Sequence, residues 1–152
     1  MSDLKQVGLK YTPLTKKAMR ICFEAHKDQL DKSGMPYVFH PFHLAEQMDT
    51  EAEICTALLH DVVEDTDITL DDLRNEGFPE DILSAIFHMT HKDLTPYLDY
   101  VRAMRSDPIA SKVKLADLKH NSTLERLDHP SEKDLKRREK YLKAIEILTE
   151  NR

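Results

Sequence analysis

Four ionisable residues lie within the most apolar run of the chain. The segment ALLHDVVEDT, residues 57–66, places His60 and Asp61 between two aliphatic pairs, and Glu64 and Asp65 follow about one helical turn later. An unpaired charge costs several kcal/mol to bury, whereas a whole domain is stable by only about 5–15 kcal/mol. If this run lies in a core, a ligand or a partner group must compensate the charges.

A second set of polar residues interrupts an apolar helix face further along the chain. The expected helix over 108–127 has apolar residues at helical spacing, namely Ile109, Val113, Ala116, Leu124 and Leu127. Asp117, His120 and Asn121 lie on the same side of that helix. Because Asp117 and Asn121 are four positions apart, their side chains can converge on one point.

His40 supplies a third element of the same kind. We expect it at the N-capping position of a helix that begins with Pro41, where its imidazole is free to point at a ligand. Together with His60, Asp61 and Asp117 it offers two imidazoles and two carboxylates, a set that suits manganese, iron or zinc. A bound cation would neutralise the carboxylates and so remove the cost of burying them. From spacing alone, however, a histidine or aspartate on an apolar face is more often a hydrogen-bonded core residue, and that alternative stays open at this point.

The elements that must position these residues are helices. The chain has only three glycines and no alternating β-branched run, and several prolines stand where a first helical residue would lie. Thr50 with Glu53 and Ser131 with Asp134 have the spacing of capping boxes. The expected helices cover 14–30, 41–48, 51–63, 70–76, 80–91, 96–105, 108–127 and 132–149. No linker or repeat divides residues 1–152, so we predict a single all-α domain whose C-terminal helix, 132–149, packs on the bundle through Leu135, Leu142, Ile145 and Leu148.

Composition narrows the function classes. A net charge of −6 argues against binding of a nucleic acid polymer, which favours a basic face. No apolar run approaches the roughly 18 residues that a membrane span needs. The N-terminal segment lacks the apolar core of a signal peptide, so we predict a cytoplasmic protein. Cys22 and Cys55 stand apart in apolar segments and are read as buried reduced thiols. The sequence does not indicate an oligomeric state.

The order His40, His60-Asp61, Asp117 resembles the H…HD…D signature of the HD-domain metal-dependent phosphohydrolases. Three segments resemble more closely the hydrolase domain of the RelA/SpoT family and its small stand-alone alarmone hydrolases. They are AHKDQLDKSGMPYVFHP (25–41), TALLHDVVEDT (56–66) and VKLADLKHN (113–121). The resemblance is strongest over residues 18–127. It implies a single-domain, HD-type helical bundle that acts as an enzyme.

The resemblance also implies roles for individual residues. The implied ligands of a manganese ion, with iron or zinc as alternatives, are His40, His60, Asp61 and Asp117. Glu64 and Asp65 match the pair that handles the nucleophilic water and proton transfer. The residues that match the substrate side of the site are Lys32, Ser33 and Asn121. The family reaction removes pyrophosphate from the 3′ position of guanosine tetra- or pentaphosphate, so the expected partner is a small phosphorylated nucleotide.

Three departures from the family pattern lie at substrate-reading positions. Close relatives usually carry an arginine before Lys32 that stacks on the guanine base, whereas this chain has Asp31, which cannot stack and would repel phosphate. Met-Arg-Thr is replaced by residues 122–124, Ser-Thr-Leu, and Thr-Lys-Leu by residues 90–92, Thr-His-Lys. The further cations that could face a pyrophosphate are Lys92, Lys112, Lys119 and Arg126, and each reads first as a surface residue.

Two alternatives to alarmone hydrolysis therefore stay open. The first is an HD phosphohydrolase that acts on another nucleotide or phosphoester, and Asp31 keeps it open. The second is a non-catalytic, metal-bound module that binds an alarmone or a protein partner. The intact Glu64-Asp65 pair argues against this second alternative, because a binding module would have no need to keep both carboxylates.

Overall fold

The chain is helical throughout its described part. The computed structural model describes residues 9–92 and 94–150. The helices are α1 (Pro13–His26), α2 (Phe39–Glu46), α3 (Glu51–Leu59), α4 (Val62–Asp65), α5 (Leu70–Asn75), α6 (Glu80–Met89), α7 (Tyr97–Ala103), η1 (Met104–Ser106), α8 (Pro108–Asn121), η2 (Leu124–Arg126) and α9 (Glu132–Thr149). No β-strand occurs in these two ranges, where the one isolated bridge joins Leu30 and Pro36. The prediction of an all-α fold is confirmed.

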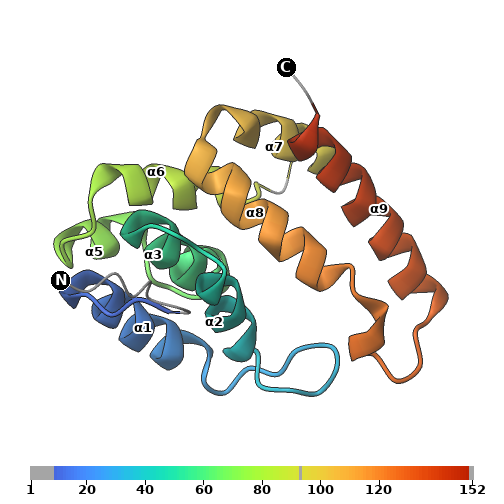
Figure 1. The fold of residues 1–152 in the computed structure, drawn as a ribbon, viewed down its shortest axis with the longest axis horizontal. Helices are drawn as coiled ribbons and strands as arrows, with labels where there is room; N and C mark the ends of the chain where they lie inside the picture. The colour runs from blue at the N-terminus through green and yellow to red at the C-terminus, as the bar shows by residue number, and fades with distance from the viewer. Residues whose placement is uncertain (1–8, 93, 151–152) are drawn as a thin grey trace, which may run out of the picture.

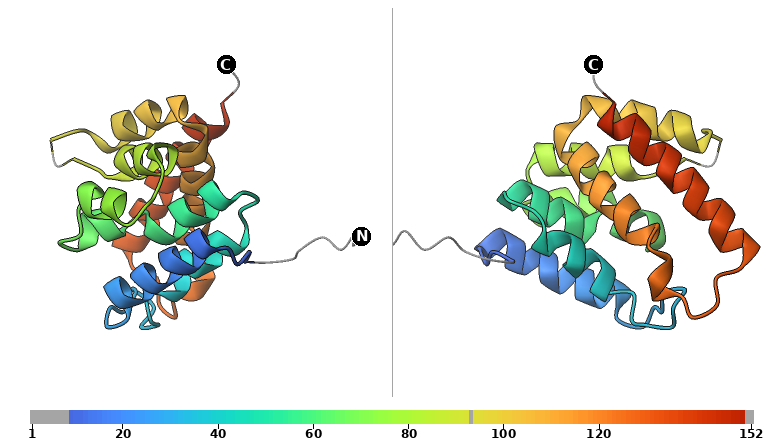
Figure 2. Two further views of the ribbon diagram at one scale, coloured as in Figure 1. Left: turned by 90° about the vertical axis from the view of Figure 1, so that its left-hand side faces the viewer. Right: turned by 45° about the vertical axis from the view of Figure 1, so that its right-hand side comes forward.

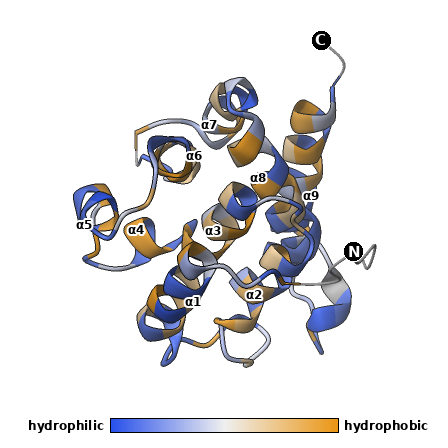
Figure 3. Ribbon diagram, turned by 60° about the vertical axis from the view of Figure 1, so that its left-hand side comes forward, coloured by the Kyte–Doolittle hydropathy of each residue, from blue (hydrophilic) through white to orange (hydrophobic). Residues whose placement is uncertain are grey.

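Helix α3 lies at the centre and is covered by other helices. It packs against α1, α2, α6 and α8, and its residues 54–59 are all buried (Figure 1). The covering helices carry both hydrophilic and hydrophobic residues, as expected for amphipathic helices around a core (Figure 3). Helix α9 packs on α7 and α8, and the right-hand view of Figure 2 shows α8 and α9 side by side. The C-terminal end of α3 therefore delivers the segment that follows it into the interior.

The predicted helix over 51–63 is broken in the structure. Helix α3 ends at Leu59, residues 60–61 form a turn, and α4 begins at Val62. The His60 Nδ1 atom lies 2.6 Å from the carbonyl oxygen of Ala57, the oxygen that would accept the next helical N–H group in an unbroken helix. The break is slight, because His60 (φ −57°, ψ −32°) and Asp61 (φ −103°, ψ −4°) both keep right-handed helical angles, and His60 Nε2 lies 3.1 Å from Asp61 Oδ2.

The predicted position of His40 as an N-cap is wrong. Helix α2 begins at Phe39 after the N-cap residue Val38, so His40 is the second helical residue. Pro41 is tolerated in this first turn because its missing N–H group would have no helical partner there. The predicted first helix also ends earlier, at His26.

The predicted helix over 108–127 ends at Asn121. The hydroxyl groups of Ser122 and Thr123 both donate to the carbonyl oxygen of Lys119, which satisfies the exposed end of α8 without another helical turn. The chain then forms the short η2 helix, whose last residue is Arg126. This early end redirects the chain towards the loop that joins α1 to α2.

The predicted helix caps are confirmed. Thr50 with Glu53 and Ser131 with Asp134 form reciprocal capping boxes at the starts of α3 and α9. Gly77 follows α5 with a φ of 98°, the left-handed conformation that glycine adopts most easily. These caps fix where the chain leaves each helix.

The packing prediction for the C-terminal helix is partly wrong. Leu135 and Leu142 are exposed, whereas Ile145 and Leu148 pack against the core as expected, together with the buried Ala144. The two cysteines are buried and free, as predicted. Within the described ranges, every helix is too short or too polar to cross a membrane.

Candidate functional site

The four predicted metal-ligating residues come together from three elements. His40 lies on α2, His60 and Asp61 form the turn after α3, and Asp117 lies on α8. The Nε2 atom of His40 is 2.8 Å from Asp117 Oδ1. The Nε2 atom of His60 is 3.1 Å from Asp61 Oδ2 and 3.7 Å from Asp117 Oδ1. Candidate ligand atoms of His40, His60 and Asp61 all lie within 4.8 Å of one another.

The His60 ring presents a lone pair to this cluster. Its Nδ1 atom faces the Ala57 carbonyl oxygen, which can only accept, so we assign the ring proton to Nδ1 and the lone pair to Nε2. Nε2 is buried and has no hydrogen-bond partner among the described residues. The nearest oxygens belong to carboxylates, which also carry lone pairs when ionised. A cation between these atoms would turn repulsion into attraction, so the donor set fits a divalent metal ion.

The two carboxylates of the cluster differ in their electrostatic surroundings. Desolvation, followed by the charge of Asp117, raises the pKa of Asp61 well above its ordinary value, although 23% of its side chain is exposed. Burial alone would also raise the pKa of Asp117. The charge of Lys114 and the hydrogen bond from His40 outweigh burial and hold the Asp117 pKa well below its ordinary value. Asp61 is thus the carboxylate that still needs a positive charge.

Lys114 is a site residue that the sequence reasoning missed. Its Nζ atom donates to Asp117 Oδ2 at 3.0 Å, and only 12% of its side chain is exposed. The ammonium group also lies over the rings of Tyr97 and Tyr100, at 5.8 and 5.5 Å from their centroids. The available signal was the i, i+3 spacing of Lys114 and Asp117 inside the segment VKLADLKHN.

Tyr37 is a second missed residue. Its hydroxyl group donates to Asp61 Oδ2, which orients that carboxylate towards the cluster. The Tyr37 ring also contacts His26, with 4.9 Å between the ring centroids. His26 is fully buried and donates from Nδ1 to the side-chain oxygen of Gln29 at 2.9 Å. All three residues belong to the segment 25–41, where the sequence analysis assigned roles only to Asp31, Lys32, Ser33 and His40.

His120 contacts the cluster from α8. Its Nδ1 atom lies 2.7 Å from His40 Nδ1, so one of these two ring nitrogens donates to the other. Burial, followed by the charges of His40 and Arg126, lowers the pKa of His120 to about 4. Without a metal ion, His40 Nε2 donates to Asp117 Oδ1 and His40 Nδ1 accepts from His120. A neutral His120 could instead accept a proton from His40 Nδ1, which would free the lone pair of His40 Nε2 for a cation.

The predicted catalytic pair lies on α4, one helical turn after Asp61. The backbone N–H of Asp65 donates to the carbonyl oxygen of Asp61 at 2.9 Å, and both Glu64 and Asp65 are exposed. Glu64 Oε1 accepts the backbone N–H of His91 at 2.7 Å. This bond fixes the Glu64 carboxylate and places the divergent segment 90–92 beside it. Because the donor is a backbone group, the contact does not require a particular side chain at position 91.

A pocket of about 380 Å³ opens beside the cluster. The predicted substrate residues Lys32, Ser33 and Asn121 all line it, and His40 connects it to the cluster. Asn121 also donates from Nδ2 to Asp117 Oδ1 at 3.0 Å, as their spacing predicted. Helix α9 supplies a wall that the sequence analysis had assigned only to packing, through Asp134, Arg137 and Tyr141.

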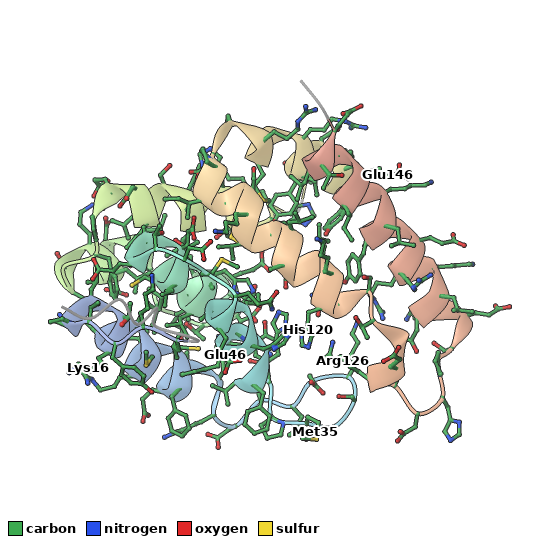
Figure 4. The ribbon with its side chains drawn as sticks, viewed as in Figure 1. Lys16, Met35, Glu46, His120, Arg126 and Glu146 are labelled. Carbon is green, nitrogen blue, oxygen red and sulfur yellow. The ribbon has the colours of Figure 1, made fainter. Side chains whose placement is uncertain are left out.

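Of the cations expected to face the substrate, some line the pocket and others do not. Lys32 and Arg126 line the pocket, together with the unforeseen Arg137. Lys112 is engaged elsewhere, because its Nζ atom donates to Asp49 Oδ2 at 2.6 Å and to Glu53 Oε1 at 2.8 Å. Figure 4 labels Arg126 and His120, which lie at the same end of α8 near the loop that carries Met35. The pocket therefore combines cations from the loop, from η2 and from α9.

The expectation that Asp31 repels phosphate needs correction. Its Oδ1 atom accepts hydrogen bonds from Ser33 N, Ser33 Oγ and Met35 N, at 2.8, 2.7 and 3.0 Å. Its Oδ2 atom accepts from Arg126 Nη2 at 3.0 Å. The carboxylate is 13% exposed and its charge is paired. Asp31 thus shapes the turn that contains Gly34, whose φ is 83°, and holds Arg126 against the loop.

The chain has relatives of known sequence. No family model matches the chain. It is 35% identical over 137 residues to a GTP pyrophosphokinase of Myxococcus xanthus, a match that covers 78% of the chain and 18% of that protein. It is 37% identical over 114 residues to the mouse guanosine-3′,5′-bis(diphosphate) 3′-pyrophosphohydrolase MESH1, covering 65% of the chain and 63% of that protein. The chain thus spans less than a fifth of the first relative and about three fifths of the second.

The fold has a counterpart among solved structures. A structure described as a metazoan ortholog of SpoT that hydrolyses ppGpp and plays a role in starvation responses superimposes with a TM-score of 0.73. The match covers 93% of this chain and 88% of that one, at 20% sequence identity. At this identity the likeness establishes the fold, which is the HD-type helical bundle that the sequence predicts.

Proposed function

We propose that the chain is an HD-type protein of the RelA/SpoT hydrolase-like kind and a metal-dependent phosphohydrolase that removes the 3′-pyrophosphate from guanosine tetra- or pentaphosphate. One observation carries the proposal. A cluster of buried lone pairs from two imidazoles and two carboxylates adjoins a pocket lined by cations. Such a cluster suits a divalent cation, and such a pocket suits a small ligand with several phosphates.

The proposed ligands of the metal are His40, His60, Asp61 and Asp117. Their support is the convergence of donor atoms of His40, His60 and Asp61, the closeness of Asp117 Oδ1 to both histidines, and the unpartnered Nε2 of His60 among the described residues. Manganese is the proposed ion, with iron and zinc as alternatives, because the set mixes imidazoles with carboxylates and contains no thiolate. A bound divalent cation would act as a Lewis acid on a water molecule and on a phosphoryl oxygen.

Glu64 and Asp65 are the proposed proton-transfer groups. Hydrolysis requires that the attacking water lose a proton and that the 3′ oxygen of the leaving nucleotide gain one. Both carboxylates are exposed at the end of α4, three and four positions after Asp61, so water reaches them. The hydrogen bond from His91 N to Glu64 Oε1 leaves Oε2 available to accept a proton.

The substrate has phosphates at two ends of its sugar, and the pocket offers positive charge at two places. One is the proposed metal cluster, which the pocket reaches at His40. The other is the wall formed by Lys32 and Arg137, which Ser33 also lines. We propose that the 3′-pyrophosphate lies at the cluster and the 5′-pyrophosphate at this wall. Asn121, which contacts Asp117, lies between the two regions of the site.

A product assay tests the proposal. The protein loaded with manganese should convert guanosine tetraphosphate into guanosine diphosphate and pyrophosphate, and a chelator should stop the reaction. A parallel screen of other phosphorylated nucleotides and phosphoesters addresses the first alternative, since turnover there without turnover of guanosine tetraphosphate would reassign the substrate. Tight binding of guanosine tetraphosphate without turnover of any compound would favour the non-catalytic module. The cytoplasmic location stays a prediction.

A further inference from the structure

The Asp31–Arg126 ion pair occupies a part of the pocket wall to which the proposed function gives no role. Both residues line the pocket, and 26% of the Arg126 side chain is exposed. The pair joins the loop between α1 and α2 to η2, across 95 positions of the sequence. Its contacts define what Arg126 can offer to a ligand.

The two terminal nitrogens of the guanidinium are already engaged. Arg126 Nη2 donates to Asp31 Oδ2 at 3.0 Å, and Arg126 Nη1 donates to the carbonyl oxygen of His120 at 3.2 Å. Arginine binds a phosphate through parallel N–H groups directed at its oxygens, and here protein acceptors take one from each terminal nitrogen. The planar face remains, and no aromatic ring within the described ranges stacks on it.

The charge of the ion pair also indicates that this wall suits an uncharged group better than phosphate. Asp31 neutralises Arg126, and Asp134 likewise pairs with Arg137 at 3.0 Å, whereas Lys32 forms no ion pair with a described residue. Phosphate is therefore attracted to the side of Lys32 more than to Arg126. Asp31 is itself immobilised by Ser33 and Met35, and this keeps the guanidinium in a fixed plane. A rigid, neutralised guanidinium face suits an uncharged planar group.

The position of Arg126 relative to the proposed metal cluster fits a nucleoside. Arg126 contacts the backbone of His120, and the ring of His120 contacts His40. A nucleotide whose 3′ group lies at the cluster has its base one sugar away, and therefore near this wall. We propose that the face of the Arg126 guanidinium is the surface on which the base of the substrate stacks, with Asp31 as its positioning residue. This inference rests on the proposed function for the choice of a nucleotide.

The test measures the binding of guanosine diphosphate and of pyrophosphate, the two products of the proposed reaction, which the 3′-reaction does not consume. Guanosine diphosphate carries a base and pyrophosphate does not, so their dissociation constants on the manganese-loaded protein separate base from phosphate contacts. Arg126→Lys keeps the positive charge and removes the plane. The dissociation constant of guanosine diphosphate should rise about tenfold or more, the effect expected from loss of base stacking, whereas that of pyrophosphate should stay within about twofold of the wild-type value.

A second variant examines Asp31 as a positioning residue. Asp31→Asn keeps an oxygen for the turn but removes the charge that neutralises Arg126. Guanosine diphosphate should bind more weakly because the plane is less well fixed, whereas pyrophosphate should bind more tightly because Arg126 becomes an unpaired cation. If Asp31 had only a structural role, the Asp31→Asn variant would bind both ligands more weakly, and that result would overturn the assignment.

The control is Arg102→Lys on α7, where Arg102 forms an exposed ion pair with Asp99. It should change neither dissociation constant. Two results contradict the inference: Arg126→Lys binding guanosine diphosphate like the wild type, or wild-type protein binding guanosine diphosphate no tighter than pyrophosphate. The binding constants do not depend on turnover. If they follow the expected pattern but guanosine tetraphosphate is not hydrolysed, the base site holds and the proposed reaction fails.

Discussion

Lys114 Nζ donates to Asp117 Oδ2 at 3.0 Å, with only 12 and 7% of the two side chains exposed. The pair gives Asp117 a permanent positive partner within the protein. Asp61, 3.1 Å from His60 Nε2, forms no ion pair with a lysine or arginine among the described residues, and desolvation and the charge of Asp117 raise its pKa well above the ordinary value. The two carboxylates of the proposed metal site are therefore stabilised in different ways, one by a lysine and one by the expected ion.

Removal of Lys114 should destabilise the metal-free protein. Lys114→Met leaves a buried carboxylate without its cation, and breaking such a pair typically costs about 3–5 kcal/mol of unfolding free energy. We expect a loss of about 3 kcal/mol, because His40 and Asn121 still contact Asp117. Urea unfolding in the presence of a chelator measures the difference.

The matched control is Lys112→Met on the same helix. Lys112 pairs with Asp49 and Glu53, and 38% of its side chain is exposed. An exposed pair contributes less than about 1 kcal/mol, so this variant should unfold close to the wild type. Equal losses for Lys112→Met and Lys114→Met would contradict the buried pair.

Tyr37→Phe should weaken metal binding without unfolding the protein. The Tyr37 hydroxyl orients Asp61 Oδ2, and loss of such a contact typically lowers metal affinity about 10–100-fold. Competition with a fluorescent chelator gives the affinity of the variant for manganese. Tyr11→Phe, at an exposed tyrosine, should bind manganese like the wild type. Unchanged affinity in Tyr37→Phe would mean that Asp61 needs no orientation by this hydroxyl.

Local signals in the sequence account for much of the fold. Capping residues such as Thr50 and Ser131 predicted helix starts correctly, since a cap depends on contacts three residues apart. Helix ends were less predictable. The end of α3 depends on the His60 side chain taking a carbonyl oxygen, and a hydrophobic pattern that continues past it does not reveal this competition.

The features of the site were also predictable where they depend on local sequence and unpredictable where they depend on distant contacts. The convergence of His60 and Asp117 followed from polar residues placed on apolar helix faces, which a sequence displays. The partners of Asp31 and the pocket wall at Arg137 depend on contacts between segments about 100 positions apart, and spacing carries no information on these. Asp31 was therefore read as a free negative charge, whereas the structure pairs it with Arg126.

High pH should destabilise the fold through the two thiols. Burial raises the pKa of Cys22 and of Cys55 from 9.0 to about 12. Between about pH 9 and 12 the unfolded chain releases thiol protons that the folded chain retains, so the unfolding free energy is complete below pH 9 and falls as pH rises. Urea midpoints at several pH values check this, and Cys22→Ala/Cys55→Ala should show a shallower decline. A slope identical to that of the wild type would assign the decline to other groups.

The proposed division of labour between ligands and proton-transfer groups predicts two different defects. Glu64→Gln keeps an oxygen that can accept the His91 N–H, so the variant should retain about one manganese per chain. Its turnover should fall by roughly 10²–10⁴-fold, the usual contribution of a general acid or base. His60→Gln removes the Nε2 lone pair from the cluster and should lose the metal as well as turnover. Metal analysis of the purified variants, alongside the product assay, separates the two outcomes. Loss of manganese from Glu64→Gln would place Glu64 among the ligands, and a fully active metal-free protein would exclude the proposed metal site altogether.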